Sequence, residues 1–149
     1  MQGTDALVNI ASLGFGHAES IISAAQTAGI KRTIFISTTA IFTQLNARSK
    51  KVRVAAELAI ETSGLKYTIL RPTMIYGSPR DRNMWRLIRF IRVSPIIPIF
   101  GDGKSLQQPI YVDNVAQAVV SCLSNEKTIG KSYNIAGKHP LTYNEVIET

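Results

Sequence analysis

The glycine pair Gly14 and Gly16 follows an apolar run and precedes a helix-like run, which is the order of a phosphate-binding loop. A dinucleotide fingerprint reads Gly-x-Gly-x-x-Gly, and its backbone N–H groups cradle a pyrophosphate. Here Glu19 occupies the third glycine position, where its carboxylate would repel a pyrophosphate. The acidic residue that binds the ribose, expected about 20 positions further on, is also missing between Lys31 and Ala40. The pattern therefore argues against a phosphate cradle at Gly14.

Arginines on the segment 83–93 are a second candidate for chemistry. At helical spacing, one face of this segment is apolar and the opposite face is basic. The apolar face is formed by Met84, Leu87, Ile88 and Ile91, and the basic face by Arg82, Arg86 and Arg89. One interpretation is a solvated helix face. The other is a phosphate-binding edge of a substrate cleft, because the guanidinium fork holds oxyanions in a bidentate way.

Composition limits the remaining possibilities. The chain has 149 residues, of which 45% are hydrophobic and 18% charged, as expected for one globular domain. A net charge of +7 favours an anionic partner. The basic residues lack interleaved aromatics, so nucleic acid is not expected. His17 and His139 have no acidic or cysteine neighbours at metal-binding spacing, so no metal site is predicted.

The compartment is indicated by two features. No apolar run is long enough to span a bilayer, so no membrane association is predicted. The single cysteine, Cys122, lies in an apolar run, where a buried core thiol is expected. One cysteine is typical of a reducing environment, and we expect a cytoplasmic protein.

Short β-branched runs alternate along the chain with helix-like patterns. The predicted strands span 6–11, 33–37, 67–70, 110–112 and 132–136. The predicted helices span 18–28, 52–62, 83–93 and 115–123, the last capped by Asp113 or Asn114. A capping box, Thr142 with Glu145, opens one more helix just before the chain ends. This alternation is typical of βαβ units and predicts an α/β fold with a parallel sheet.

Several segments resemble, in order, the extended short-chain dehydrogenases/reductases. They are DALVNIAS, AAQTAGIKRTIFIST, SGLKYTILRPTMIYG, FGDG, QQPIYVDNVAQAVV and KSYNIAGKHPLTYNEV. The most specific set is Arg71-Pro72, Tyr76-Gly77 and Val112-x-x-Val115-Ala116. This is the family of NAD-dependent epimerases and dehydratases, which includes nucleoside-diphosphate-sugar epimerases, and the resemblance covers nearly the whole chain.

The resemblance implies an atypical, N-terminally truncated member. The segment 6–11 matches the family's fourth strand, so the Rossmann-type parallel sheet would be partial and the glycine loop would lie upstream. Residues 1–80 would form the C-terminal half of an NAD(P)-binding domain. Residues 81–149 would form a substrate-side region with the final sheet elements and a helix cut at the C-terminus. NAD or NADP is the implied cofactor, although these residues alone would bind it weakly. A strand at 6–11 without its neighbour would expose backbone groups, so a homo-oligomer is expected.

The family's catalytic hydroxyl has a counterpart in this sequence. Family members use a Ser or Thr together with a Tyr that a Lys follows four residues later, the Lys lowering the pKa of the Tyr. Thr38, at the end of the strand 33–37, resembles the Ser or Thr. A hydroxyl that only terminates a strand is an equally good interpretation.

The family's catalytic tyrosine has no counterpart, because residues 43–66 contain no Tyr. In one register Asn46 takes the Tyr position and Lys50 the Lys position. In the preferred register, which keeps the family's spacing to a glutamate, here Glu57, Ser49 replaces Tyr and Arg53 replaces Lys. The competing interpretation of Ser49 and Arg53 is a solvated helix N-terminus.

Binding residues are also implied by the resemblance. Those assigned to the cofactor follow or end strands, and they are Ala11, Ser12, Ser37, Pro72, Thr73 and Met74. Sugar-nucleotide epimerases often carry Asn at the position of Met74. Asn83 and Arg86 are assigned to the substrate, and Arg71 is expected to be structural, held by backbone carbonyls.

Two functions follow. The first is an NAD(P)-dependent epimerase/dehydratase-like protein that acts on a small molecule such as a sugar nucleotide. The second is a non-catalytic member of the same fold that senses nucleotides or serves as a scaffold. The family's usual role favours the first, and the missing tyrosine favours the second.

Overall fold

The protein is represented by a computed structural model that describes residues 3–44, 46–78, 84–94, 96–99 and 101–148. Its strands are β1 Ala6–Asn9, β2 Arg32–Ile36, β3 Tyr67–Pro72, β4 Ile75–Tyr76, β5 Leu106–Gln107, β6 Ile110–Tyr111, β7 Lys131–Ile135 and β8 Leu141–Thr142. Its helices are α1 Ala18–Thr27, α2 Arg48–Glu61, α3 Met84–Val93, α4 Val112–Ser124 and α5 Tyr143–Glu148, with short 3-10 turns η1 Leu13–Phe15, η2 Thr39–Phe42 and η3 Glu126–Thr128. The chain divides into two units, one of residues 1–72 and 117–134 and the other of residues 73–116 and 135–149.

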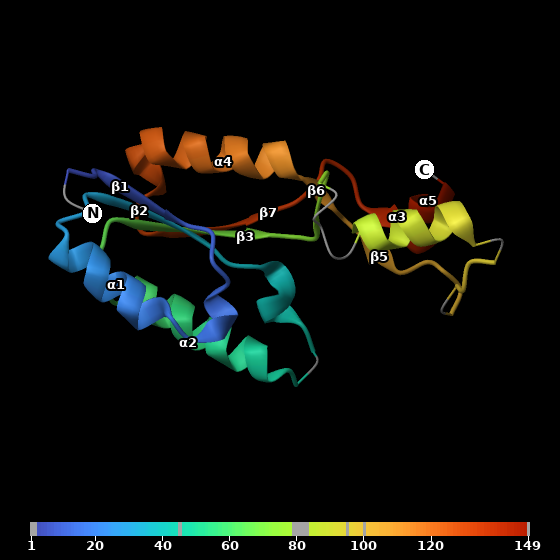
Figure 1. The fold of residues 1–149 in the computed structure, drawn as a ribbon, viewed down its shortest axis with the longest axis horizontal. Helices are drawn as coiled ribbons and strands as arrows, with labels where there is room; N and C mark the ends of the chain where they lie inside the picture. The colour runs from blue at the N-terminus through green and yellow to red at the C-terminus, as the bar shows by residue number, and fades with distance from the viewer. Residues whose placement is uncertain (1–2, 45, 79–83, 95, 100, 149) are drawn as a thin grey trace. The chain divides into compact units, whose positions relative to one another are not determined.

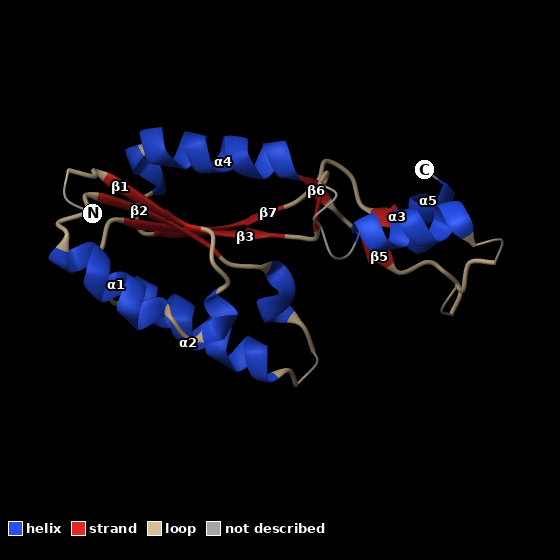
Figure 2. Ribbon diagram, in the orientation of Figure 1, coloured by secondary structure: helices blue, strands red, loops and turns tan. Residues whose placement is uncertain are grey.

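The first unit is built on a sheet with the strand order β1-β2-β3-β7. β1 pairs with β2, and β2 with β3, in parallel. Helices α1 and α2 cover one face of this sheet, and α4 lies over the other (Figure 1). Figure 2 shows the same sandwich of strands between helices. The predicted α/β fold with a partial Rossmann-type sheet is confirmed.

The central strands are buried from both sides, which explains their nearly continuous apolar runs. Phe35 on β2 and Ile69 on β3 are fully buried, and Ile60 of α2 is buried against them. Leu13 of η1 and Ile22 of α1 complete this cluster. Each such side chain stabilises the fold by about 1.5–3 kcal/mol. This core fixes η1 and α2 at the same end of the sheet, where the candidate site lies.

A buried arginine, which was not predicted from the sequence, binds α4 to the face of the sheet that this helix covers. Arg32 of β2 is only 9% exposed. Its guanidinium donates to the carbonyl of Lys66 at 2.8 Å, to the carbonyl of Cys122 at 2.9 Å and to Oγ1 of Thr128 at 2.8 Å. Burial lowers the pKa of Arg32, an effect that Cys122 partly opposes. The guanidinium thus ties the end of α4 to the sheet.

Several boundaries differ from the predicted ones. β1 ends at Asn9 rather than at residue 11, because the Asn9 side chain donates to the carbonyl of Ala11 at 3.2 Å and turns the backbone away. Helix α2 begins at Arg48, four residues before the predicted start at 52, because the polar residues 48–51 form its first turn. Helix α4 begins at Val112, so Asp113 lies inside its first turn and does not cap it.

The second unit contains two small sheets, in which β4 pairs with β6 in parallel and β5 pairs with β8 antiparallel. Gly77 has a φ of +111°, and a side chain there would collide with the ring of Tyr111. The predicted capping box is confirmed. The Glu145 carboxylate accepts from the backbone N–H of Thr142 at 2.6 Å and from its hydroxyl at 2.8 Å, and these bonds lower the pKa of Glu145.

Candidate functional site

A cavity of about 250 Å³ lies where β1 and β2 end. Ligands of open parallel sheets bind at this carboxyl edge. The cavity is lined by Ile10, Ser12, Leu13, Ile36, Ser37, Thr38, Ala40 and Arg53. Four of the residues predicted for the site, which are Ser12, Ser37, Thr38 and Arg53, are therefore brought together from the segments that follow β1 and β2 and from α2.

Two of these residues are hydroxyl caps of short 3-10 turns. Ser12 precedes η1, and its Oγ accepts from the N–H of Gly14 at 3.3 Å. Thr38 precedes η2, and its Oγ1 accepts from the N–H of Ala40 at 3.2 Å. In both side chains the bond uses an oxygen lone pair, so the hydroxyl proton is left to be donated. Ala11, the third predicted cofactor residue of this loop, is exposed and does not line the cavity.

The third hydroxyl, Ser37, is engaged elsewhere. It is buried, and its Oγ donates to Oε1 of Glu57 in a short hydrogen bond. Glu57 is 5% exposed and also accepts from Arg71, with Nε at 2.9 Å and Nη2 at 2.6 Å from Oε2. The guanidinium of Arg71 lies 5.7 Å from the ring centroid of Phe42. Arg71 is therefore bound by the carboxylate of Glu57 and not by the backbone carbonyls that were expected.

Arg53 is the cation of the cavity. It lies in the second turn of α2 and is half-buried. Its guanidinium covers Gly14, since Cζ, Nε and Nη2 each lie 3.2 Å from where a Gly14 Cβ would stand. Gly14 thus provides room for an arginine, which is a different role from the phosphate cradle considered for it. Within the described part of the chain, the guanidinium has no hydrogen-bond or ion-pair partner.

Ser49, predicted in place of the catalytic tyrosine, is half-buried in the first turn of α2. It lies one turn before Arg53 on the same helix face, but it does not line the cavity. In the alternative register, Nζ of Lys50 donates to the carbonyl of Thr43 at 2.6 Å, and Asn46 is exposed ahead of the helix. The structure therefore brings Thr38 and Arg53 together and leaves Ser49 and Lys50 outside the cavity lining.

The remaining predicted cofactor residues, Pro72, Thr73 and Met74, lie at the end of β3 and just after it. Pro72 is buried, and its carbonyl accepts from the hydroxyl of Thr39 at 3.4 Å. The Thr73 hydroxyl donates to the carbonyl of Gln108 at 2.5 Å, and the Met74 carbonyl accepts from the N–H of Ile110 at 2.9 Å. The carbonyls of Pro72 and Met74 and the hydroxyl of Thr73 are thus used in hydrogen bonds within the fold.

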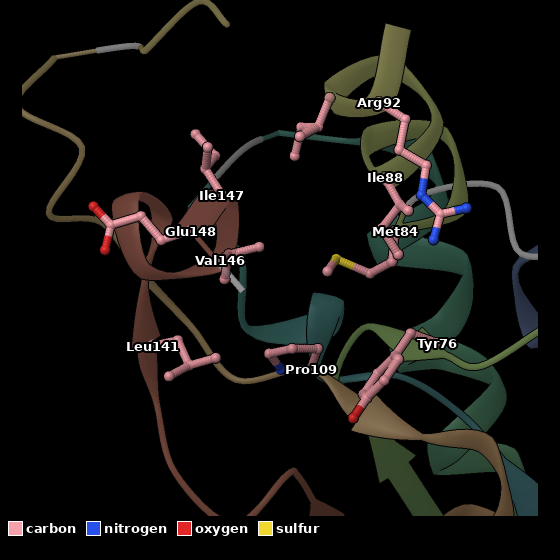
Figure 3. A pocket seen from close by; sticks show the side chains of 10 residues that line it. Tyr76, Met84, Ile88, Arg92, Pro109, Leu141, Val146, Ile147 and Glu148 are labelled. Atoms are coloured by element: carbon pink, nitrogen blue, oxygen red, sulfur yellow. The ribbon is translucent and has the colours of Figure 1, made fainter.

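A second cavity, of about 520 Å³ and mainly apolar, lies in the unit of residues 73–116 and 135–149 (Figure 3). Its wall includes the apolar stripe of α3, represented by Met84, Ile88 and Ile91, together with Leu141 and Val146. The predicted two-faced character of α3 is confirmed, since Arg86 and Arg89 are exposed away from this lining.

The arginine of α3 that does line the second cavity is Arg92, which the sequence analysis did not assign. The sequence contained one indication of this role, since Arg92 follows Ile88 of the apolar stripe by one helical turn. Arg86, predicted to contact substrate, lies outside this lining, and Asn83 lies outside the described residues. Across the described residues there is no helix long and apolar enough to cross a membrane, and no three His, Cys, Asp or Glu side chains gather as metal ligands do.

The chain is similar to known proteins both in sequence and in structure. It is 33% identical over 122 residues to an Arabidopsis thaliana protein, NADH dehydrogenase [ubiquinone] 1 alpha subcomplex subunit 9, mitochondrial, the match covering 80% of this chain and 30% of that protein. A dTDP-glucose 4,6-dehydratase from Streptomyces venezuelae, solved with NAD bound, superposes with a TM-score of 0.79 at 18% identity over 98% of this chain and 56% of the other. An epimerase from Methanothermobacter thermautotrophicus superposes with a TM-score of 0.85 at 13% identity over 97% and 55%.

These likenesses confirm the predicted resemblance to the fold of epimerases and dehydratases. The chain spans 30% of the first of these relatives and little more than half of the two solved structures. A family model described as NAD(P)H-binding matches residues 1–126, which is most of the sequence. The chain belongs to this NAD(P)H-binding family.

Proposed function

We propose that the chain contributes the nicotinamide side of an NAD(P)H site, at the cavity where β1 and β2 end, and that it holds the cofactor without carrying out the family's reaction. One observation carries this proposal. Among the described residues, the polar side chains that line the cavity are three hydroxyls and the guanidinium of Arg53. None of them exchanges a proton readily near neutral pH, because aliphatic hydroxyls are poor acids and Arg keeps its proton. Such a lining binds and orients a ligand but supplies no general acid or base.

The residue assignments belong to the same proposal. Residues 1–80 serve as the C-terminal half of a Rossmann domain, and residues 81–149 serve as the substrate-side region with the final sheet elements. Of the residues that the resemblance assigns to the cofactor, Ser12 and Ser37, which line the cavity, contact it. Support comes from the position of Ser12, Ser37 and Thr38 at the carboxyl edge of the sheet and from the family match over residues 1–126.

A sugar-nucleotide epimerase or dehydratase is the second candidate. It is favoured by the solved structures, which include a dTDP-glucose 4,6-dehydratase with NAD bound. In that case Asn83 and Arg86 bind substrate, and Thr38, Ser49 and Arg53 act on it. The two candidates differ in one measurable respect, since only the second requires turnover of NAD(P)H.

Binding of half-cofactors tests the first candidate. The sequence has no Gly-x-Gly-x-x-Gly loop to bind the pyrophosphate, so we expect the 149-residue chain to bind NADH and NADPH weakly. Reduced nicotinamide mononucleotide, which lacks the adenosine half, should bind about as well as NADH. The readout is the amide NMR shifts of Ser12 and Thr38 during titration. If NADH bound far more tightly than the mononucleotide, or if shifts occurred only away from the cavity, the proposed role would be wrong.

We also propose that the protein is a homodimer through α2. An exposed stripe on this helix runs through Lys51, Val54, Leu58 and Glu61, with Val54 47% and Leu58 60% exposed. Beside it lies a hollow of about 370 Å³ lined in part by Phe42, which is 57% exposed. In an antiparallel pair about a two-fold axis at position 56, Lys51 faces Glu61 of the second copy and Val54 faces Leu58. The stripe is therefore complementary to itself in charge and in apolar character, as a two-fold interface requires.

Charge reversal tests this dimer. Lys51→Glu should weaken the dimer, because it places two carboxylates face to face. Lys51→Glu combined with Glu61→Lys should restore it, because the pair is only exchanged. Arg48→Glu, an exposed change on the same helix outside the stripe, is the control. Sedimentation velocity over a concentration series gives the dimer fraction. A monomer at all concentrations, or a double variant no better than the single one, would count against the proposal.

We also propose that the protein is located in the cytoplasm. It is supported by Cys122, which is a free, buried thiol in the core, as is usual in reducing compartments. The Arabidopsis relative carries the word mitochondrial in its name, so imaging of the tagged full-length protein with a mitochondrial marker distinguishes the two compartments.

A further inference from the structure

Arg53 is a cation without a counter-charge in a partly enclosed place. Burying a charge without a partner costs free energy, and α2 is well supplied with solvent-exposed positions for an arginine. Instead, this guanidinium lies against the backbone of Gly14 and faces a cavity. Of the described residues that line the cavity, none is an Asp or Glu. A bound anion would supply the missing partner.

The hydroxyls of the cavity are arranged to add hydrogen bonds to such an anion. Ser12 and Thr38 accept from backbone N–H groups, so each keeps a proton to donate into the cavity. Glu57, the carboxylate bonded to the lining residue Ser37, is already neutralised, since it is paired with Arg71 at 2.6 Å and accepts a hydrogen bond from the Ser37 hydroxyl. Lys50 and Lys51 on the same helix add positive potential. All of these features favour negative charge in the cavity.

We propose that this cavity is an oxyanion site, in which Arg53 with the hydroxyls of Ser12 and Thr38 holds one carboxylate or phosphate group of a small ligand. The cavity of about 250 Å³ accommodates a group of this size, and the planar guanidinium fork suits both kinds of oxyanion. The inference deepens the proposed function, on which it rests for the location of the ligand. The ligand presents a charged group at the position where the family's enzymes place a reacting hydroxyl.

Gly14 acquires a role in this site. A Cβ at position 14 would stand 3.2 Å from three guanidinium atoms of Arg53, which is closer than carbon normally approaches. Gly14→Ala should therefore displace the guanidinium while leaving its charge in place. Ser12 and Thr38 would keep their capping hydrogen bonds. The variant therefore tests whether binding depends on where the Arg53 charge lies, because the charge itself is retained.

Titration with inorganic phosphate and with acetate tests the site in the full chain. We expect saturable NMR shifts at the Ser12 and Thr38 amides and at the Arg53 side-chain N–H. Arg53→Gln should weaken binding by about 10- to 100-fold, the loss of one charge-assisted interaction. Arg48→Gln removes the same charge from an exposed position of the same helix and should leave binding within about twofold. Gly14→Ala should weaken binding in the same direction as Arg53→Gln.

Two results would overturn the proposal. One is the absence of saturable shifts with either anion. The other is an equal loss in Arg53→Gln and Arg48→Gln, which would mean that diffuse positive potential attracts the ions. Circular dichroism of each variant checks that the fold is retained, and Arg53→Lys, which keeps the charge but lacks the fork, should fall between wild type and Arg53→Gln.

A further comparison identifies the source of the oxyanion. If the cofactor's own phosphate fills the site, reduced nicotinamide mononucleotide will displace inorganic phosphate and will bind better than the phosphate-free riboside only while Arg53 is present. If a separate small acid fills it, the riboside and phosphate will bind together. Both results support the site. Anion binding without any nicotinamide binding would defeat the proposed function alone, and the reverse would defeat only the oxyanion site.

Discussion

Replacement of Glu57 by alanine is expected to lower the free energy of unfolding by about 3–5 kcal/mol. The carboxylate is 5% exposed and holds Arg71 at 2.6 Å, and it also accepts a hydrogen bond from the Ser37 hydroxyl. Its removal leaves the Arg71 guanidinium, whose side chain is 16% exposed, with neither a counter-charge nor full access to water. Domains are stable by only about 5–15 kcal/mol, so this one change removes a large part of the total.

Matched variants show whether the buried pair is the cause. Glu126→Ala removes an exposed carboxylate from the same unit and should change the free energy by no more than about 0.5 kcal/mol. Glu57→Leu with Arg71→Met replaces both charges by apolar groups, and it should recover most of the loss because no charge is left unpaired. Urea denaturation followed by circular dichroism gives the midpoints. A double variant as unstable as Glu57→Ala would show that the packing volume at this place, and not the unpaired charge, sets the cost.

The sheet was predictable because local patterns determine it. Runs such as 33–37 and 67–70 are β-branched and apolar, since β2 and β3 are buried on both faces. Strand ends were less predictable, because single side chains decide them. Asn9 ends β1 through its own hydrogen bond to Ala11, and no hydrophobic pattern contains that information.

The contacts of the site were only partly predictable. The hydroxyls Ser12, Ser37 and Thr38 could be placed at one edge because parallel strands end together. The guanidinium partners could not be found in this way. Arg71 reaches Glu57 across 14 positions, and Arg32 reaches Cys122 across 90, so tertiary packing alone brings them together. Arg92 was missed for another reason, since it follows Ile88 by one turn and so lies beside the apolar stripe of α3, outside the stripe of arginines.

The full-length protein is expected to show no ordinary alcohol–ketone turnover with a nicotinamide cofactor. Proton transfer requires a side chain whose pKa lies near the working pH, and general acid–base catalysis contributes about 10²–10⁴-fold in rate. Arg53 lines the cavity, and Ser49 lies one turn earlier on the same helix. In the register preferred from the sequence, these two residues take the lysine and tyrosine positions of the family. Neither serves as a general acid or base. The measurement is NAD(P)H absorbance over a panel of sugar nucleotides and small ketones, with the protein at high concentration.

Restoring both family residues is the sharpest form of this test. Ser49→Tyr with Arg53→Lys should raise any trace activity more than the two single changes combined, because the lysine acts through the tyrosine by favouring its phenolate. Thr38 already lies in the cavity and would supply the third group. Robust turnover by the wild-type protein that Ser49→Ala leaves unchanged would mean that another residue carries the proton. Lys50 would be examined first, although its Nζ is bound to the Thr43 carbonyl at 2.6 Å and would have to leave that bond to act.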